Sequence, residues 1–318
     1  MNNRLDRRQF LQLSGVVVGA ALLGAGCAAN KPGSAGTSPQ RALPPAPTGD
    51  QAYLAAAHGA SPSAITEAAL KAVGGIERFV KSGQSVIIKP NICVDYHTAE
   101  YAATTNPEVV AALVKLCLGA GAKRVRVMDM PFGGTPEAAY AITGIAEAVK
   151  GAGGEMEIMS PVKFIKTAIP EGKDLKAWDI YRDALEADVL IDVPIAKHHS
   201  LSRLTLGGKN LLGLVSSANQ IHQNLGQRIA DLISVIRPTL TVVDAYRILV
   251  AHGPTGGSLN DVKAANTVIA SHDIVAADAY GATLFNLKGK DVAFVKAAAD
   301  MGLGTLDLAS VKVAEVNV

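Results

Sequence analysis

Residues 85–110, SVIIKPNICVDYHTAEYAATTNPEVV, contain the signals of a strand, a loop and a helix, in that order. The apolar run 85–89 is typical of a short buried strand. Thr105 or Asn106 can cap a helix that begins with the Pro-Glu pair at 107–108, because proline needs no N–H at a helix start and the carboxylate favours the helix dipole. A strand followed by a helix is the repeating unit of a parallel sheet.

The same alternation of strand and helix continues along the chain. A second helix begins at Thr135 and Pro136, and the glycine-rich segments GAGAK and GAGGE end the two helices. We therefore predict an α/β fold, with a mostly parallel sheet flanked by helices, in one lobe or two. The further strand candidates are 124–129, 155–159, 188–192, 240–244 and 266–270.

The composition indicates a globular protein rather than a disordered one. Of the 318 residues, 49% are hydrophobic and 18% are charged, which is enough to bury a large core. The net charge is +2, from 30 basic and 28 acidic residues, and no basic run is interleaved with aromatic residues. Nucleic acid is therefore not an expected partner.

Residues 1–27 have the features of a Tat-type export signal: a basic start, a twin arginine at 7–8 and a short apolar stretch that ends in small residues. LLGAGC at 22–27 resembles a lipoprotein cleavage box. We therefore expect export by the Tat route and a lipid anchor on Cys27, which would hold the protein to a membrane in the periplasm or cell envelope. Because Gly24 stands where the box prefers leucine, an uncleaved anchor or ordinary signal cleavage is the alternative.

The composition changes again after this signal. Residues 28–50 are rich in Pro, Gly, Ser and Ala, which predicts a flexible linker, and 51–318 is then the α/β domain. The domain contains Cys93 and Cys117 but no CxxC pair, so we expect no iron–sulfur cluster or structural zinc bound by its own cysteines. Cys117 lies in an apolar helical pattern and is expected to be an inert buried thiol.

Four charged residues stand at the last position of an apolar run, and they are Lys89, Asp129, Asp192 and Asp244. An open α/β sheet collects its ligand-binding groups outside the carboxyl ends of its strands, so together these residues predict a pocket at that edge. Any single aspartate can instead cap the turn that follows its strand, and for one aspartate we consider the two interpretations about equal.

The segment 194–213, PIAKHHSLSRLTLGGKNLLG, concentrates polar residues directly after an apolar run. His198 and His199 are adjacent, so in an extended segment their side chains point to opposite sides and at most one is expected in the site. A histidine there suits general acid–base catalysis or metal binding. The alternative is a loop histidine that is hydrogen-bonded to the backbone.

The motif GGKN at 207–210 precedes the apolar run LLGLV, which predicts a helix start. Free backbone N–H groups there, together with Lys209, would bind a phosphate or carboxylate. We expect this segment and the one after strand 85–89 to face one pocket, because both leave the same edge of the sheet. The predicted catalytic residues are His198, His199 and Lys209, and the predicted ligand-binding residues are Lys89, Asn91, Asp129, Asp192, Lys197, Asn210 and Asp244.

Two loops add further candidates. The loop 91–104 has no obvious structure, and loops of this length are often functional, so it is a candidate lid. Its His97 is considered as a metal ligand, although a solvated position in the loop is the favoured interpretation. HGPTGG at 252–257 is either a second anion-binding loop or a plain tight turn.

Five blocks follow one another along the chain: IIKPNI at 87–92, TTNPEVV at 104–110, the segment 194–213, HGPTGG at 252–257 and ASHDIVAADAYGA at 270–282. In this order they resemble the blocks of the prokaryotic domain-of-unknown-function family number 362. The resemblance runs from about residue 50 to the C-terminus and implies little chemistry, because the family's reaction is not generally established. Some relatives carry a ferredoxin-like cysteine domain, whose cysteines this chain lacks.

The segment 197–224 is also similar to a stretch of the nickel-pincer lactate racemases. That resemblance implies that His199 or His198 is a base facing the ring of the cofactor, that Lys209 is the attachment point of a nucleotide-derived nickel cofactor, and that His222 is a nearby ligand or base. The sequence departs from that pattern because Asn210 follows the lysine and the spacing is approximate.

Together, these features favour an enzyme or cofactor-carrying protein that acts on an anionic small molecule, with a metal or a nucleotide-like cofactor as candidate groups. The competing hypothesis is a non-catalytic lipoprotein that captures a small anion. Two lobes joined by a hinge would favour capture, whereas a histidine of perturbed pKa in a closed pocket would favour catalysis. A purely structural envelope protein is disfavoured by the charges at the strand ends.

Overall fold

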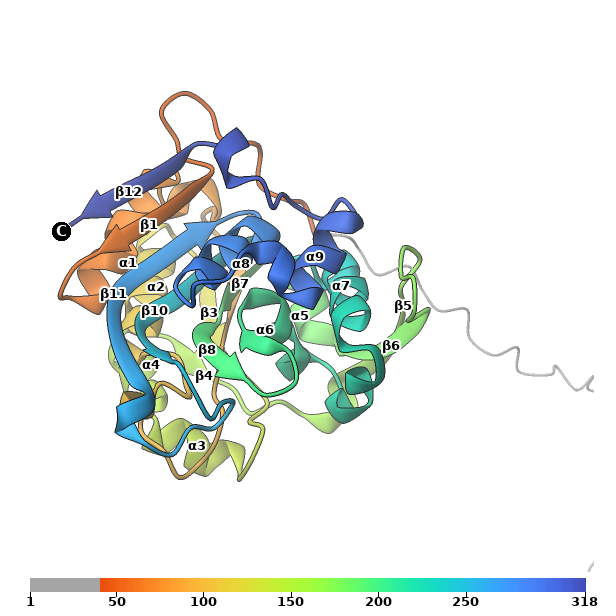
Figure 1. Ribbon diagram of the computed structural model, residues 1–318. Coiled ribbons are helices and arrows are strands. Elements are labelled where there is room, and N and C mark those ends of the chain that lie inside the picture. Colours follow the sequence, from red (N-terminus) through yellow and green to blue (C-terminus); the bar gives the residue numbers. More distant parts are fainter. Residues whose placement is uncertain (1–40) are drawn as a thin grey trace, which may run out of the picture. The chain divides into compact units, whose positions relative to one another are not determined.

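In the computed structural model, which describes residues 41–318, the predicted parallel strands form the middle and one edge of a single sheet (Figure 1). Neighbouring strands in this part all run in the same direction. Lys89 and Asp192 are directly opposite each other in the register of two of these strands. In spatial order the strands are β10 (Leu240–Leu249), β7 (Val189–Val193), β2 (Ser85–Pro90), β3 (Arg124–Val127) and β4 (Glu155–Met156).

The other edge of the sheet brings together the two ends of the described chain. β11 (Val262–Ser271) is antiparallel to both β10 and β1 (Leu54–His58), and β12 (Val313–Asn317) pairs with β1 in parallel. β8 (Ile195–His199) continues beside β10 and pairs with β9 (Arg203–Thr205). A separate hairpin is formed by β5 (Phe164–Ala168) and β6 (Ala177–Tyr181), and α5 (Arg182–Glu186) follows it.

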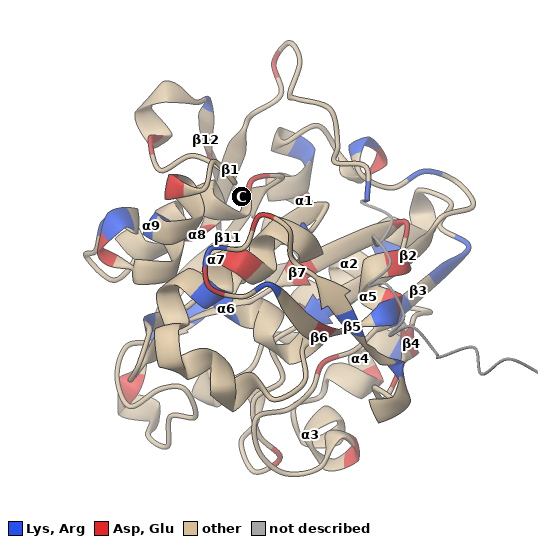
Figure 2. Ribbon diagram, turned by 90° about the vertical axis from the view of Figure 1, so that its right-hand side faces the viewer, with Lys and Arg blue, Asp and Glu red and all other residues tan. Residues whose placement is uncertain are grey.

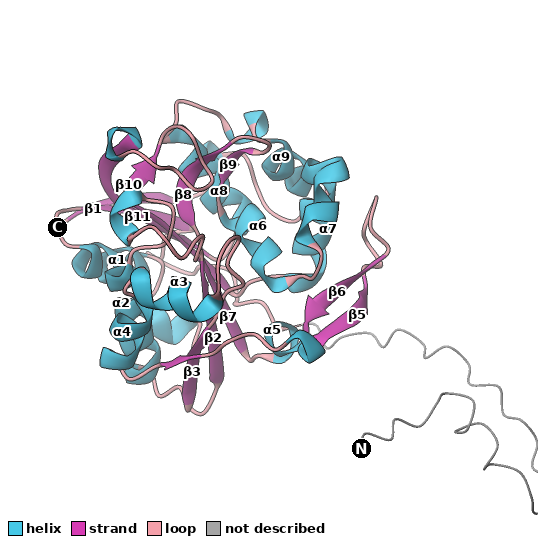
Figure 3. Ribbon diagram, turned by 90° about the horizontal axis from the view of Figure 1, so that it is seen from below, coloured by secondary structure: helices cyan, strands magenta, loops and turns pink. Residues whose placement is uncertain are grey.

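Helices cover both faces of the sheet (Figure 3). One face carries α1 (Pro62–Ala72), α2 (Pro107–Gly119) and α4 (Ile145–Gly151), with α3 (Pro136–Ile142) directly before α4. The opposite face carries α6 (Gly207–Asn210), α7 (Leu225–Ile236), α8 (Ile274–Thr283) and α9 (Ala293–Asp300). Two 3₁₀ helices, Leu211–Leu214 and Ala218–Asn224, connect α6 to α7.

The central strands are apolar throughout because both of their faces are buried. In β2, Val86 and Ile88 pack into the core with α1 and α2, whereas Ile87 packs into the core with α7, α8 and α9. A parallel strand covered on both faces needs apolar residues at successive positions, and β2 has them. The capping predictions also hold here, since the side chain of Asn106 caps α2 and that of Thr135 caps α3.

The α/β fold with a mostly parallel sheet is therefore confirmed, and the described residues belong to one compact unit rather than two lobes. Several boundaries were predicted wrongly. The run 124–129 ends as a strand at Val127, the run 155–159 contributes only two residues, and 266–270 belongs to the antiparallel β11. The predicted second helix is interrupted at Gly144, whose φ of 76° no L-residue adopts readily.

The start of the described chain is fixed to the domain although it contains no helix or strand. Arg41 donates hydrogen bonds to backbone carbonyls at the ends of α5 and α7, including those of Ala187 and Ile236, each at 3.0 Å. The end of the predicted linker 28–50 is thus held by Arg41. The predicted signal and Cys27 lie outside the described residues.

The distribution of charged residues and the hydropathy of the helices can now be compared with the fold. In the view of Figure 2, Lys and Arg alternate with Asp and Glu over the ribbon, as the small net charge suggests. Within residues 41–318, no helix combines the length and the apolar character needed to cross a membrane.

Candidate functional site

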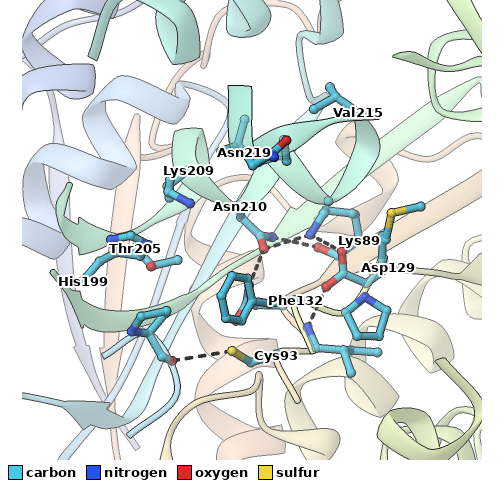
Figure 4. Close-up of a pocket in the computed structure, with 18 of the residues that line it drawn as sticks. Lys89, Cys93, Asp129, Phe132, His199, Thr205, Lys209, Asn210, Val215 and Asn219 are labelled. Carbon is cyan, nitrogen blue, oxygen red and sulfur yellow. Dashed lines mark hydrogen bonds and ion pairs between the residues drawn. The ribbon is translucent and has the colours of Figure 1, made fainter. Parts of the chain in front are cut away.

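A pocket of about 320 Å³ opens where β2, β3 and β8 end (Figure 4). The segment after β2, the segment after β3, and the run from β8 to the second 3₁₀ helix contribute to its wall. The polar side chains that line it belong to Lys89, Asn91, Cys93, Asp129, Lys197, His199, Thr205, Lys209, Asn210, Ser217, Asn219 and His222.

Lys89, at the end of β2, is fully buried and fully partnered. Its ammonium donates to the carbonyl of Pro90 at 2.8 Å and to Asn210 Oδ1 at 2.9 Å, and it lies 2.6 Å from Asp129 Oδ1. Two of these contacts are hydrogen bonds and the third is an ion pair, so the ammonium is surrounded by three acceptors of the chain itself. Lys89 therefore holds the end of β2 to α6 and to the segment after β3.

Asn210 extends this arrangement to β7. Its amide nitrogen donates to Asp192 Oδ1 at 2.8 Å and to the carbonyl of Lys89 at 3.2 Å, and Asn91 donates to its Oδ1 at 3.1 Å. We call Lys89, Asp129, Asp192 and Asn210 the closed network. Its members are at most 2% exposed, so their hydrogen bonds are made without competition from water.

The two carboxylates of the closed network favour the protonated form more than usual. Burial raises the pKa of Asp129, although Lys89 opposes this, and it raises the pKa of Asp192 well above the ordinary value. Asp129 Oδ2 accepts from the backbone N–H of Ile92 at 2.6 Å, whereas Asp192 Oδ2 is buried without a hydrogen-bond partner among the described residues. Asp192 does not line the pocket and acts on it through Asn210.

Gly213 allows the backbone after α6 to approach the Lys89–Asp129 pair. A Cβ atom at this position would lie 2.0 Å from Asp129 Oδ1 and 2.8 Å from Lys89 Nζ. Only glycine fits there, so the close approach depends on the absence of a side chain.

Lys209 lies on the same pocket but in a different environment. It comes from α6 and is half-buried, and within residues 41–318 its ammonium has no hydrogen-bond or ion-pair partner. Burial and the charge of Lys197 lower the pKa of Lys209 to about 8, partly opposed by Cys93. The amine is therefore protonated only in part at mildly alkaline pH.

His199, the last residue of β8, presents a neutral ring to the pocket. Its Nδ1 accepts from the backbone N–H groups of Leu201 at 3.1 Å and Ser202 at 3.3 Å, so the proton of the neutral ring is on Nε2. Burial and the neighbouring Lys209 lower the pKa of His199 to about 3. In this tautomer Nε2 carries the proton and is a hydrogen-bond donor. The sequence predicts a base at this position, whereas the ring of His199 offers the pocket a donor. We call Lys209 and His199 the open wall.

The two residues of β8 before His199 differ in their relation to the pocket, since Lys197 lines it and His198 does not. His198 accepts at Nδ1 from the backbone N–H of Gly253 at 3.1 Å and does not line the pocket. Lys197 is buried, donates to the carbonyl of Ala103 at 2.6 Å and lies beside Cys93, and burial lowers its pKa. Of the two adjacent histidines, the structure brings only His199 to the site.

The helix start at 207–210 does not offer the expected anion cradle. The backbone N–H groups of Gly207 and Gly208 donate to the carboxylate of Asp278 at 2.6 and 2.8 Å. Asp278 comes from α8, and burial raises its pKa to about 7. Sequence reasoning missed this residue. The one available signal was an aspartate in the middle of the apolar helix run IVAADAY.

Asp244 is also not part of the pocket. It lies in the middle of β10, where its carboxylate accepts from the backbone N–H of Asn106 at 2.7 Å and of Tyr246 at 3.0 Å. The carboxylate therefore holds the start of α2 and its own strand, so the capping interpretation applies. Burial raises the pKa of Asp244 to about 6.

Of the remaining histidine and loop candidates, some line the pocket and others do not. His222 lines the pocket, with Nδ1 3.0 Å from the carbonyl of Asn219, whereas His97 stacks on Tyr101 and does not line it. In the part of the chain that the structure describes, no three His, Cys, Asp or Glu side chains are grouped to hold a metal ion. Of the glycine-rich loop 252–257, Pro254 lines the pocket, and its carbonyl is 3.6 Å from Cys93 Sγ.

The sheet order and the helices on both of its faces define an α/β protein with a mostly parallel sheet. Within this class, the chain belongs to the family described as "Domain of unknown function (DUF362)", whose model matches residues 86–283. This confirms the resemblance found in the sequence.

Three similar proteins can be named. The thylakoid-associated protein sll1697 of Synechocystis sp. is 28% identical over 224 residues, which is 66% of this chain. The chain spans only 65% of the length of that relative. The lactate racemase apoprotein of Thermoanaerobacterium thermosaccharolyticum is similar in structure with a TM-score of 0.48 and 13% identity, over 72% of this chain and 56% of that one. A protein from Thermotoga maritima has a TM-score of 0.38 and 14% identity, over 58% of this chain and 51% of that one.

Proposed function

We propose that this protein is an enzyme that binds an anionic small molecule on the open wall, with Lys209 as the group that exchanges a proton with it. The observation that carries the proposal is the amine of Lys209, which faces the pocket without a partner among the described residues and has a pKa lowered to about 8. Export and a lipid anchor, expected from residues 1–27, stay predictions from the sequence.

The balance of charge in the pocket favours an anion. The ammonium of Lys89 is paired with Asp129, and that of Lys197 is bound to a carbonyl, which leaves Lys209 as the cation that a ligand can neutralise among the described lining residues. A half-buried charge without a counter-charge is unfavourable, so an anionic ligand gains affinity by relieving it.

The neutral ring of His199 complements the cation. Its Nε2–H can donate to one oxygen of a carboxylate or phosphate while Lys209 binds another. A histidine of pKa about 3 keeps this donor over the whole physiological range of pH. The open wall therefore supplies two donors, only one of which titrates near neutral pH.

The pKa of Lys209 favours catalysis over simple capture. A group that titrates near the working pH can both give and take a proton, which is what general acid–base catalysis requires. A protein that only captures an anion gains nothing from an amine that loses its charge near pH 8. The single compact unit also lacks the two-lobe arrangement that a hinged capture protein uses.

Calorimetric titration with acetate and inorganic phosphate at several pH values tests the proposal. We expect at least one anion to bind wild type, with an affinity that falls as pH rises through about 8, because only the ammonium form attracts it. Lys209→Ala should weaken binding at least about tenfold, and Lys209→Arg should bind with no fall near pH 8, because a guanidinium stays charged. Lys115→Ala, an exposed site on α2, is the control.

The catalytic part needs its own readout. We expect wild type, incubated in D2O with a panel of carboxylates and phosphates, to place deuterium on carbon in at least one of them, and Lys209→Arg to lose this exchange. Binding without exchange in the whole panel would leave the non-catalytic capture of an anion as the function. A covalent group on Lys209 would appear as added mass in the intact protein and would abolish the titration near pH 8.

A further inference from the structure

The mouth of the pocket carries three apolar residues in a row, Met130, Pro131 and Phe132, which we call the apolar lip. All three line the pocket, yet Phe132 is 74% exposed and Met130 is 39% exposed. Single exposed apolar side chains are ordinary on protein surfaces. Here they directly follow Asp129 of the closed network and line the same pocket as Lys209 and His199.

The apolar character continues from the mouth into the pocket. Leu212 and Val215 line it from the segment after α6, and both are buried. In the view of Figure 4, Lys209 and His199 lie to the left of the Lys89–Asp129 pair, and the ring of Phe132 lies between the two groups. One pocket therefore combines a cationic wall with apolar surface, and a ligand that matches both must itself be part anion and part apolar.

The lip is fixed in place by the backbone around it. The N–H groups of Phe132 and Gly133 both donate to the carbonyl of Cys93, at 2.9 and 3.1 Å. At Gly134, with φ +83°, a Cβ atom would lie 1.9 Å from Cγ of Asp95, so the loop packs directly against that carboxylate. A backbone that is held before the ligand arrives loses little conformational freedom on binding.

We propose that the anion bound by this protein carries an aromatic ring, with its acidic group on the open wall and its ring against Phe132. The proposal rests on the proposed function, since it names the class of ligand for the same site. A pocket of about 320 Å³ is at the small end of the range for small-molecule sites, which suits a single ring with one acidic substituent. Aromatic rings favour offset or edge-to-face contacts with one another.

A protein partner fits these observations less well. A specific interface buries roughly 800 Å² on each partner, far more than three side chains at the mouth of a pocket provide. The lip also lines a concave surface together with the unpaired amine, which is the arrangement expected of a small-molecule site.

The test compares pairs of anions that differ by the ring: acetate with benzoate, and inorganic phosphate with phenyl phosphate. Cyclohexanecarboxylate controls for apolar bulk without aromaticity. Affinities are measured by calorimetry for wild type, Phe132→Ala and Phe132→Trp, with Val162→Ala as a control at an 87% exposed apolar position outside the pocket. Melting temperatures of all variants confirm that each is folded.

We expect benzoate and phenyl phosphate to bind wild type about three- to tenfold tighter than their ring-free partners. Phe132→Ala should bring this ratio to about one, whereas Phe132→Trp and Val162→Ala should keep it. A ratio near one in wild type, a ratio unchanged in Phe132→Ala, or equal binding of cyclohexanecarboxylate would overturn the proposal of an aromatic ligand.

The same measurements separate this inference from the proposed function. Acetate or phosphate could bind wild type and lose this binding in Lys209→Ala, while an aromatic ring on the anion does not raise the affinity. The proposed anion site would then be supported, and the proposal of an aromatic ligand would be wrong. If no anion of either series binds wild type, both fall together.

Discussion

The closed network and the open wall lie on one pocket and are built from similar residues, but they use their charges in opposite ways. The ammonium of Lys89 has two hydrogen-bond acceptors and an ion-pair partner, whereas that of Lys209 has no partner among the described residues. Of these two lysines at the edge of the sheet, one is therefore paired within the fold, and the other is the candidate for the proposed ligand contact. The difference is decided by counting hydrogen-bond partners, which position in the sequence does not reveal.

The two regions should respond differently to mutation for the same reason. Removing a member of the closed network leaves a buried group without its partner, and the cost appears as stability. Removing a member of the open wall leaves the core intact, and the loss appears in ligand binding. The predictions below test this contrast.

The largest effect is expected from Lys89→Met, which keeps most of the side-chain volume but leaves Asp129 without its cation. Breaking a buried ion pair on one side costs about 3–5 kcal/mol in the free energy of unfolding. Urea denaturation at pH 7 measures it. In the double variant Lys89→Met with Asp129→Asn the unpaired charge is gone, so part of the stability should return. A loss below about 1 kcal/mol in the single variant would show that the closed network does not hold the strands together.

A smaller effect is expected from Asp278→Ala, which removes the acceptor for the N–H groups of Gly207 and Gly208. Buried donors left without partners cost about 1–3 kcal/mol. Asp278→Asn keeps one carbonyl acceptor, so its loss at pH 7 should be smaller. Equal stability of Asp278→Ala and wild type would mean that water reaches the two N–H groups and replaces the carboxylate.

The stability of this pair of variants should also depend on pH. Burial raises the pKa of Asp278 to about 7, above its unfolded value, so the folded state binds the extra proton between about pH 4 and 7. The contribution of this group to stability is therefore present at low pH and lost as pH rises through 7. Asp278→Asn, compared with wild type by urea denaturation across that range, should remove this dependence.

The smallest effect, and one of opposite sign, is expected from Lys209→Met. The lowered pKa of Lys209 means that its charge is unfavourable in the folded state at pH 7, so an apolar replacement should raise the free energy of unfolding, on the order of 1 kcal/mol after solvent screening. The gain should shrink between pH 8 and 10.5, where the folded wild type has lost the proton. Urea denaturation at pH 7 and pH 10 measures it, with Lys115→Met as control. A destabilised Lys209→Met would place Lys209 with the closed network.

The sequence predicts the parallel part of the fold well because the signal there is local. In the run 85–89, each residue is apolar since both faces of β2 are covered, and that pattern can be read without knowing its neighbours. β8 was missed because its strand residues Lys197, His198 and His199 are polar. They form a strand through pairing with β10 and β9, and that pairing depends on segments distant in the chain.

In the candidate site, too, the residues that follow a local rule could be predicted, and those that depend on distant packing could not. Lys89 and Lys209 were placed in one pocket from the rule that parallel strands share a carboxyl edge, and the structure brings them together there. Asp129 and Asp244 looked equivalent in sequence, but Asp129 lines the pocket, whereas Asp244 accepts from the backbone N–H of Asn106 at the start of α2. The occupation of the helix start by Asp278 could not be seen, because it depends on how α8 packs against α6.

The pairing of β1 sets an order on the folding of this chain. β1 is among the first described segments to leave the ribosome, yet both of its neighbours, β11 and β12, are near the end of the chain. During synthesis, the apolar residues Leu54, Ala55 and Ala57, which are buried in the complete fold, have no strand to pair with. Such unpaired strand edges are prone to aggregation. The nascent chain therefore completes this edge of its sheet only after β12 has been made.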